Sequence, residues 1–428
     1  MNDPTTDSAL ISWVEVAPDS DFPIQNLPYG VFRAGAGAGP RIGVAIGDWV
    51  IDLAAIHEAG LFSATAIAGE NLFASEFLND FMARGGEVWG EVRRRISELL
   101  RADNPELRDA QRLRERALVR RERVAMQMPV AVGDFIDFYS SREHATNAGS
   151  LFRDPKNALP PNWLHLPIAY HGRAGSLRVS PREVRRPRGQ VKPSPEAAPI
   201  FAPSSRLDFE LEVGFFVGVG NGDGYPIPTE VAHKHIFGAV LLNDWSARDI
   251  QQWEYQPLGP FLGKSFATSI SPWVVPLAAL VPFRVAGPAQ DPPVLPYLRY
   301  TGEWNFDINL EVSLKSAAME SAVQITATNF RRLYWNVLQH LAHATVNGAR
   351  MRPGDLFASG TVSGTTPGSL GSMLEISRNG KEPITLPGGE RRGFLEDGDT
   401  VTMRGWCQGS GYRIGFGECT GRIEPCTR

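Results

Sequence analysis

The sequence predicts a mainly β protein with some helix, in which a small N-terminal β unit precedes a large mixed or antiparallel β domain, a sandwich or roll. After about residue 130, short strand-like runs bounded by Gly and Pro follow one another without the regular strand and helix alternation of a doubly wound sheet. The 428 residues, 43% of them hydrophobic, can bury at least one large core and favour two domains of unequal size.

The N-terminal third changes from a β pattern to a helical one. Residues 28–54 contain short apolar runs separated by Gly and Pro, which predict a small β unit. The Gly-rich segment 34–40 lacks the register of a dinucleotide-binding loop and ends in Pro, so it predicts a hairpin loop. Residues 65–124 are helical in pattern and strongly basic, with a break at 103–105, which predicts solvated helix faces or a linker.

The rest of the chain is dominated by predicted strands. They cover 207–220, 237–244, 271–280, 306–314 and 398–408, and the clearest helix covers 329–348. We therefore predict two domains, residues 1–124 and residues 125–428.

Charge and composition narrow the class of ligand. The formal net charge of −4 gives no electrostatic reason to expect a nucleic acid or an anionic membrane as partner, so a small molecule is favoured. The first residues lack a basic leader and an apolar core, and no stretch approaches the roughly 18 apolar residues of a membrane span, so we expect a cytoplasmic protein. Three widely spaced cysteines predict neither a zinc site nor a disulfide framework.

Acidic residues occur where strands should be apolar. Strand alternation within 207–216 places apolar side chains on one face and Asp208, Glu210 and Glu212 on the other. Asp244 ends the apolar run 237–244, and Asp137 lies among aromatic residues. Carboxylates gathered in apolar surroundings need a neutralising cation or protons, and oxygen ligands suit Mg²⁺, Ca²⁺ or Mn²⁺. The pattern alone leaves this metal site and an ordinary solvated strand face equally open.

Several other motifs favour structural roles. His340 and His343 lie one helical turn apart without an acidic neighbour, which predicts a packed helix face. His233 and His235 make a poor metal site alone and predict a loop or short helix start. The Gly-rich run 218–226 has neither the Lys-Ser/Thr nor the following helix of a phosphate loop, so it predicts a turn.

Seven stretches spread over roughly 134–420 resemble the fumarylacetoacetase family and occur in the family's order. They are DFYSSREHATN, NALPPNWLHLPIAYHGRAGS, LDFELEVGFFVG, NDWSARDIQQWEYQPLGPFLGKSF, RPGDLFASGTVSG, GSMLE and CQGSGYRIGFG. The resemblance implies a small SH3-like N-terminal β domain, a β-rich catalytic domain and a homodimer.

The same resemblance implies a set of site residues. It makes Asp137, Glu210, Glu212 and Asp244 the ligands of a divalent metal, and these are the acids singled out above. It makes His144 the general base and Glu375 the acid that orients it. It places Arg248, Gln251 and Lys264 around the negative charge that develops on the substrate during the reaction. Arg248 and Gln251 follow Asp244 by four and seven residues, a spacing that predicts one helix face.

Substrate contacts and a second ion are implied as well. The expected substrate-contacting residues are Tyr139, Arg153, Tyr170, Gln251, Tyr255 and Thr361, of which Arg153 suits a substrate carboxylate because its planar guanidinium can bind both oxygens. Lys264 and Thr268 match a second cation site of structural character. Ala267 stands there in place of the family's usual Gly, so this site is the least supported.

The activity that the resemblance implies is metal-dependent hydrolysis of the carbon–carbon bond of 4-fumarylacetoacetate to fumarate and acetoacetate. This reaction is the last step of tyrosine and phenylalanine catabolism. One alternative is another diketo-acid hydrolase, or a decarboxylase, on the same scaffold. The other is a metal-stabilised binding protein without enzymatic activity, in which His144 and Glu375 would be dispensable.

Overall fold

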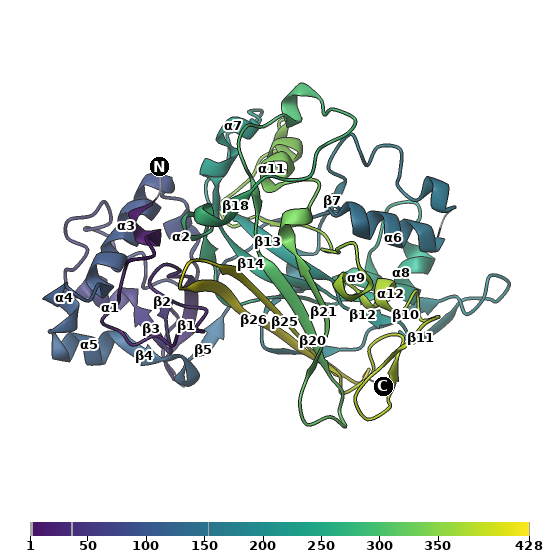
Figure 1. Cartoon of the computed structure of the whole chain (residues 1–428), viewed down its shortest axis with the longest axis horizontal. Coiled ribbons are helices and arrows are strands. Elements are labelled where there is room, and N and C mark those ends of the chain that lie inside the picture. Colours follow the sequence, from purple (N-terminus) through teal and green to yellow (C-terminus); the bar gives the residue numbers. More distant parts are fainter. Residues whose placement is uncertain (1–2, 36, 153, 428) are drawn as a thin grey trace.

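A computed structural model describes residues 3–35, 37–152 and 154–427 of the chain (Figure 1). A smaller N-terminal part and a larger C-terminal part lie side by side, and curled mixed sheets build the larger part (Figure 1). The predicted fold class, mainly β with some helix, is therefore confirmed.

The N-terminal part is built on one antiparallel sheet of five strands in the order β4-β3-β2-β1-β5. The strands are β1 (Tyr29–Arg33), β2 (Arg41–Ile46), β3 (Trp49–Asp52), β4 (Leu118–Arg120) and β5 (Ala125–Gln127). This confirms the β unit predicted at 28–54, and residues 34–40 connect β1 to its antiparallel neighbour β2. Because β5 pairs with β1 just beyond residue 124, we propose that the N-terminal domain extends through Gln127.

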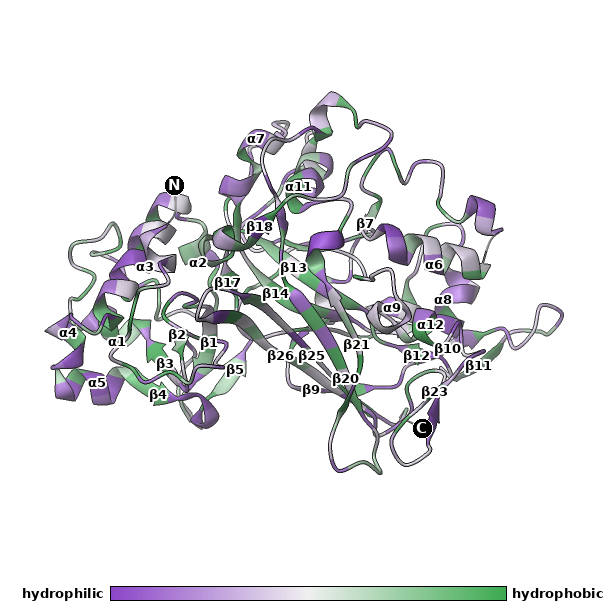
Figure 2. Ribbon diagram, in the orientation of Figure 1, coloured by the Kyte–Doolittle hydropathy of each residue, from purple (hydrophilic) through white to green (hydrophobic). Residues whose placement is uncertain are grey.

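Among the described residues, five α-helices accompany this sheet. They are α1 (Leu53–Glu58), α2 (Asn79–Met82), α3 (Gly86–Leu100), α4 (Pro105–Arg108) and α5 (Gln111–Ala117). The ribbons of α4 and α5 carry much purple in Figure 2, and most of their residues are exposed or half-buried, as expected for solvated helices. However, α3 buries Val92, Ile96 and Leu99 in the same core as the sheet, and its Arg93 is buried, so this helix is not a free linker. The Arg93 guanidinium donates to the backbone oxygens of Gln25 and Asn26.

The larger part contains two main sheets. Seven strands of the first lie in the order β7-β6-β22-β13-β14-β16-β8, and β17 pairs with β14 beside them. Their bounds are β6 (Phe135–Phe138), β7 (Ala169–His171), β8 (Leu177–Val179), β13 (Leu211–Val217), β14 (Ile236–Asp244), β16 (Thr268–Ile270), β17 (Val275–Pro276) and β22 (Leu356–Ala358).

The second main sheet has five strands in the order β21-β20-β25-β26-β9. Its strands are β9 (Arg182–Arg185), β20 (Asn309–Lys315), β21 (Val323–Asn329), β25 (Thr400–Gln408) and β26 (Arg413–Glu424). Apolar side chains of both sheets form one core, in which Phe215 and Leu241 of the first sheet join Val312, Met403 and Phe416 of the second. This shared core produces the predicted sandwich-like packing.

Shorter elements complete the larger part. The remaining helices are α6 (Arg142–Phe152), α7 (Thr229–Ala232), α8 (Arg248–Glu254), α9 (Leu262–Ser265), α10 (Leu277–Leu280), α11 (Val337–Thr345) and α12 (Met373–Ile376). The remaining strands form two-stranded sheets and are β10 (Arg188–Val191), β11 (Ile200–Pro203), β12 (Leu207–Asp208), β15 (Ser246–Ala247), β18 (Arg284–Val285), β19 (Asn305–Phe306), β23 (Ile384–Thr385) and β24 (Arg391–Arg392).

The two parts of the chain share a core. Tyr29 of β1 exchanges backbone hydrogen bonds of 2.9 and 2.7 Å with Val274, and its ring contacts Phe81 and Phe237. Phe237, Val240 and other residues of β14 belong to the same apolar cluster as the N-terminal sheet. The N-terminal part therefore packs against the sheet that carries Asp137, Glu212 and Asp244.

Three predicted elements are wrong in extent. The predicted strand 207–220 is divided into β12 and β13 because β12 pairs with β15, whereas β13 pairs with β14 and β22. The predicted strand 271–280 contains only the short β17 before the chain turns into α10. The predicted helix 329–348 is reduced to α11, since Asn336 and Gln339 form a capping box that begins the helix at Val337.

The residues assigned to structural roles are packed accordingly. The buried His340 ring stacks on Phe138 with 4.0 Å between centroids and contacts Ser140 Oγ at 2.7 Å, and His343 contacts Tyr297. Cys407, Cys419 and Cys426 are free thiols. Within the described part of the chain, no helix is both long and apolar enough to cross a membrane.

Candidate active site

Three strands of the first sheet bring three carboxylates together. Asp137 lies on β6, Glu212 on β13 and Asp244 at the end of β14, and one oxygen of each lies within 4.8 Å of the others. We call these three residues the carboxylate cluster. On β13 the face of Glu212 continues through Gly214 to Phe216, which packs into the core shared with the N-terminal part. The acidic face is therefore buried, and the alternative of a solvated strand face is wrong.

Part of the carboxylate cluster has no hydrogen-bond partner among the described residues. Both side-chain oxygens of Glu212 and Oδ1 of Asp137 are buried, and no hydrogen-bond partner for them lies among the described residues. Burial raises the pKa of Glu212 well above its usual value, and repulsion from Asp137 and Asp244 raises it further. Burial and repulsion from Asp244 raise the pKa of Asp137 to about 7, although Arg173 opposes the change. Oxygens in this state fit a hard divalent cation such as Mg²⁺, Ca²⁺ or Mn²⁺.

Glu210, the fourth predicted ligand, has cationic partners in the structure. Its oxygens contact Arg248 Nη1 at 2.8 Å and the Lys264 ammonium. Burial raises its pKa, but Lys264 and Arg248 outweigh that effect and leave the pKa below its usual value. Lys264 also contacts Asp244 Oδ2 at 2.8 Å, so it connects Glu210 to the carboxylate cluster. A role for Glu210 as a direct ligand stays a prediction.

Arg173 is a buried cation that the sequence analysis missed. Its Nη1 contacts Asp244 Oδ1 at 2.7 Å, and its Nη2 contacts Asp137 Oδ2 at 3.0 Å. The only signal was its place in the stretch HGRAGS, because a single Arg in a loop carries no spacing pattern that would link it to distant acids.

The buried charges around the site do not balance. Five buried carboxylates surround three cationic side chains; they are Asp137, Asp208, Glu210, Glu212 and Asp244, with Arg173, Arg248 and Lys264. With these eight groups ionised, and with Glu375 left aside because His144 is its partner, two negative charges remain without a counter-charge, which is the charge that one divalent ion supplies.

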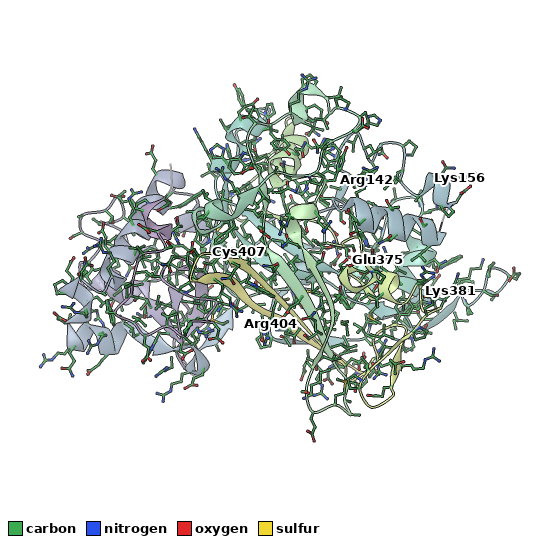
Figure 3. All side chains as sticks on the ribbon, in the orientation of Figure 1. Arg142, Lys156, Glu375, Lys381, Arg404 and Cys407 are labelled. Carbon is green, nitrogen blue, oxygen red and sulfur yellow. The ribbon has the colours of Figure 1, made fainter. Side chains whose placement is uncertain are left out.

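A carboxylate and an imidazole form a second group. His144 lies in the first turn of α6, and its Nδ1 contacts Glu375 Oε2 of α12 at 2.6 Å. Asn147, Ser363 and Ser372 donate to the same carboxylate, each at 2.9 Å. Glu375 is buried, whereas Lys156 and Lys381, which Figure 3 labels with it, are exposed.

This pair defines the state of both groups. Burial raises the pKa of Glu375, but the contact with His144 and the hydrogen bonds from Asn147 and Ser363 outweigh it and leave the pKa below its usual value. An ionised carboxylate can only accept, so Nδ1 of His144 is the donor, and in the neutral ring this tautomer leaves Nε2 as the proton acceptor. The backbone of Glu210 forms a β-bridge with that of Ser372, whose hydroxyl donates to Glu375, so the His144–Glu375 pair lies near Glu210.

Other predicted residues surround these two groups. Arg248 and Gln251 hydrogen-bond to each other at 3.3 Å, but Asp244 ends β14 and α8 begins only at Arg248. The prediction that all three share one helix face is therefore wrong. Thr268 Oγ1 lies 3.4 Å from Asp244 Oδ1 and 2.9 Å from Ser176 Oγ, which places it beside the cluster.

The predicted substrate contacts differ in their surroundings. The Tyr139 ring lies edge-on to His144 with 5.5 Å between centroids, and Tyr170 lies against Arg173. Thr361 is buried, whereas Tyr255 at the end of α8 is 46% exposed. Arg153 lies outside the described residues.

A buried carboxylate cluster beside a carboxylate–imidazole pair, in a mixed β fold, is typical of hydrolases that use a metal ion and a general base. Residues 25–129 match the family described as fumarylacetoacetase N-terminal, and residues 135–424 match the family described as fumarylacetoacetate (FAA) hydrolase C-terminal. The chain belongs to the fumarylacetoacetate hydrolase family.

Similar proteins of known name cover nearly the whole chain. The fumarylacetoacetase of Mus musculus is 54% identical over 97% of this chain and 99% of its own length. Those of Homo sapiens and Arabidopsis thaliana are 53% and 51% identical over the same shares. Two solved structures share the fold. The first is a putative HpcE protein from Mycobacterium smegmatis, with a TM-score of 0.53 and 18% identity; the match covers 93% of this chain and 100% of the HpcE chain. A fumarylacetoacetate hydrolase from Exiguobacterium antarcticum, with a TM-score of 0.50 and 16% identity, covers 93% and 99%.

Proposed function

We propose that the protein hydrolyses the carbon–carbon bond of 4-fumarylacetoacetate to fumarate and acetoacetate, the last step of tyrosine and phenylalanine catabolism. The observation that carries this proposal is the His144–Glu375 pair beside the buried carboxylate cluster. Relatives named fumarylacetoacetase that are about half identical over nearly the whole chain support the choice of substrate.

The proton transfer falls to this chain's own residues. Nε2 of His144 takes a proton from water, which is a weak nucleophile at neutral pH. Glu375 holds the ring through Nδ1 and stabilises the imidazolium that forms, as the carboxylate of a hydrolytic triad does. The hydroxide so formed attacks the carbonyl carbon beside the scissile bond, and collapse of the tetrahedral oxyanion breaks the carbon–carbon bond. The imidazolium then gives the proton to the leaving carbanion.

The remaining residues bind and stabilise charge. A divalent ion held by Asp137, Glu212 and Asp244, with Glu210 as the predicted fourth ligand, would polarise the substrate's carbonyl oxygens as a Lewis acid. The cationic groups of Lys264 and Arg248 and the amide of Gln251 stabilise negative charge on the substrate. Arg153 pairs with a substrate carboxylate, and substrate contacts are assigned to Tyr139, Tyr170, Gln251, Tyr255 and Thr361.

Purified protein with Mg²⁺ or Ca²⁺ is expected to convert fumarylacetoacetate to equal amounts of fumarate and acetoacetate. The products are measured by chromatography, and chelation followed by return of the ion is expected to stop and restore turnover. A decarboxylase would release CO₂ instead, and a hydrolase for another diketo acid would leave fumarylacetoacetate unchanged; either result contradicts the proposal. Elemental analysis identifies the bound ion and gives the number of ions per chain. The balance of buried charges favours one divalent ion per chain, without a second ion at the site predicted at Lys264 and Thr268.

We also propose that the cytoplasmic form is a homodimer. Large apolar side chains gather on the surface of the β10–β11 hairpin and of the segment from α8 to α9, namely Ile200, Phe201, Trp253, Leu258, Phe261 and Leu262. The hairpin projects from the larger part, and α8 packs on β10 (Figure 1). Exposed apolar surface of this kind is typical of a protein–protein interface.

Light scattering is expected to give twice the chain mass, 46.9 kDa, for the wild type. Leu258 is 96% exposed and Phe261 66% exposed, so replacing both by Ser removes apolar surface without disturbing the core. That double variant is expected to dissociate, whereas Leu295→Ser, which changes an exposed apolar residue outside the patch, is not. A monomeric wild type at micromolar concentration would contradict the proposal.

A further inference from the structure

Arg173 is held rigidly beside the carboxylate cluster. Its backbone has φ of 72° and ψ of 9°, a left-handed conformation that a non-glycine residue adopts only when its surroundings hold it there. The guanidinium lies over the rings of Phe135 and Tyr170, at 4.8 and 4.9 Å from their centroids. Ser176 Oγ donates to the Arg173 backbone oxygen at 2.7 Å. The side chain is therefore a fixed cation and not a mobile arm.

Its two ion pairs reach only part of the cluster. Arg173 contacts Oδ2 of Asp137 and Oδ1 of Asp244. Among the described residues, Oδ1 of Asp137 and both oxygens of Glu212 have no hydrogen-bond partner, although they are buried. An ion held by one oxygen of each of the three carboxylates would therefore share Asp137 and Asp244 with the guanidinium.

We propose that Arg173 is a positioning residue that sets the charge of the ion accepted by the carboxylate cluster. With Arg173 in place, the five carboxylates Asp137, Asp208, Glu210, Glu212 and Asp244 and their three cationic neighbours lack two positive charges, and a divalent ion completes the balance. Without it they lack three, and a trivalent ion becomes the better match. The inference rests on the proposed metal site and adds which residue determines its charge selectivity.

The electrostatic reason is that repulsion between two cations grows with the charge of each. A guanidinium that shares two carboxylates with the ion repels a trivalent ion about one and a half times as strongly as a divalent ion at the same distance. Removing the positive charge of Arg173 therefore favours both kinds of ion and favours the trivalent ion more. A substitution that keeps the charge leaves the preference close to that of the wild type.

Ca²⁺ and Tb³⁺ are suitable probes because both are hard ions that prefer oxygen ligands and their sizes are similar. Their dissociation constants are measured by calorimetry on metal-stripped protein, with Tb³⁺ luminescence as a second readout. Arg173→Gln is expected to raise the preference for Tb³⁺ over Ca²⁺ by about tenfold or more, and Arg173→Lys to leave it within about threefold of the wild type. Arg173→Met, which keeps most of the side-chain length, is measured alongside in case Arg173→Gln folds poorly.

Arg392→Gln is the matched control. Arg392 is also a buried arginine in ion pairs, but its partner Asp399 is not part of the carboxylate cluster, so its loss is expected to lower stability without changing ion preference. An unchanged preference in Arg173→Gln and Arg173→Met would overturn the proposal, as would an equal change in Arg173→Lys. Absence of ion binding by the wild type would instead contradict the metal site itself.

Discussion

Replacing His144 by Ala is expected to lower turnover of fumarylacetoacetate by about 10²- to 10⁴-fold, the usual contribution of a positioned general base. The Nδ1 contact with Glu375 holds the ring with Nε2 available to water, and α6 supplies no second imidazole to replace it. Since His144 is not one of the proposed ligands, ion affinity and folding are expected to stay close to those of the wild type.

Steady-state kinetics, calorimetry with the divalent ion and circular dichroism measure the three properties separately. His343→Ala is a suitable control because His343 is also a partly buried histidine, hydrogen-bonded to Tyr297 on the packed face of α11. Near wild-type turnover in His144→Ala would remove His144 from the mechanism. A loss of ion binding equal to the loss of turnover would show that the imidazole supports the ion site and not the proton transfer.

Replacing Glu212 by Gln is expected to abolish binding of the divalent ion and, with it, turnover, while stabilising the metal-free protein. The Glu212 carboxylate is buried with neither oxygen partnered among the described residues, so its charge is unfavourable unless an ion is present. A neutral amide of the same shape removes that charge. The melting temperature of the metal-free variant is therefore expected to exceed that of the metal-free wild type by a few degrees.

The pH dependence of stability provides a second test of the same charge. Groups whose pKa is raised by folding stabilise the protein when protonated, and this contribution is lost as the pH rises through the folded-state pKa. For Asp137 that value is about 7, and the pKa of Glu212 is raised in the same direction. The melting temperature of the metal-free wild type is thus expected to fall as the pH rises from about 4 to above 7. In Glu212→Gln, the melting temperature is expected to fall less over the same pH range.

A saturating divalent ion is expected to remove most of this pH dependence, because the ion favours the ionised carboxylates. Calorimetric melting curves between pH 5 and 8, with and without the ion, measure the effect. Glu230→Gln, which changes an exposed acid on α7, is the control and is expected to follow the wild type. A metal-free Glu212→Gln protein that melts below the wild type at pH 8 would contradict the assignment.

Much of the candidate site could be predicted from residue patterns. Strand alternation around Glu212 and the acid at the end of the run 237–244 pointed to carboxylates in apolar surroundings, and three of the four predicted ligands lie together. The resemblance supplied His144 and Glu375, which are in contact. The pattern could not distinguish a wet strand face from one buried by another part of the chain, because alternation reports two faces and not what covers them.

Element boundaries were predicted less well where long-range contacts decide them. Residues 207–217 have the composition of one strand, but Asp208 accepts hydrogen bonds from the backbone of Met373 and Leu374 and pairs with Arg248. These contacts support a separate short strand, β12, whose partner is β15. Similarly, Arg93 belongs to a basic stretch that resembles a solvated helix face. It is nevertheless buried, and its guanidinium donates to the backbone oxygens of Gln25 and Asn26, which are distant in the sequence.

Local pattern is enough to specify the fold class, the apolar faces of the strands and the acids that could hold an ion, since these follow from periodicity and side-chain chemistry. The partners of each charge follow only from the folded chain: Arg173 pairs with Asp137 and Asp244, and Glu210 pairs with Lys264 and Arg248. The physical reason is that an ion pair depends on the distance between two groups in space, and these groups come from segments that meet only when the sheets and loops pack together.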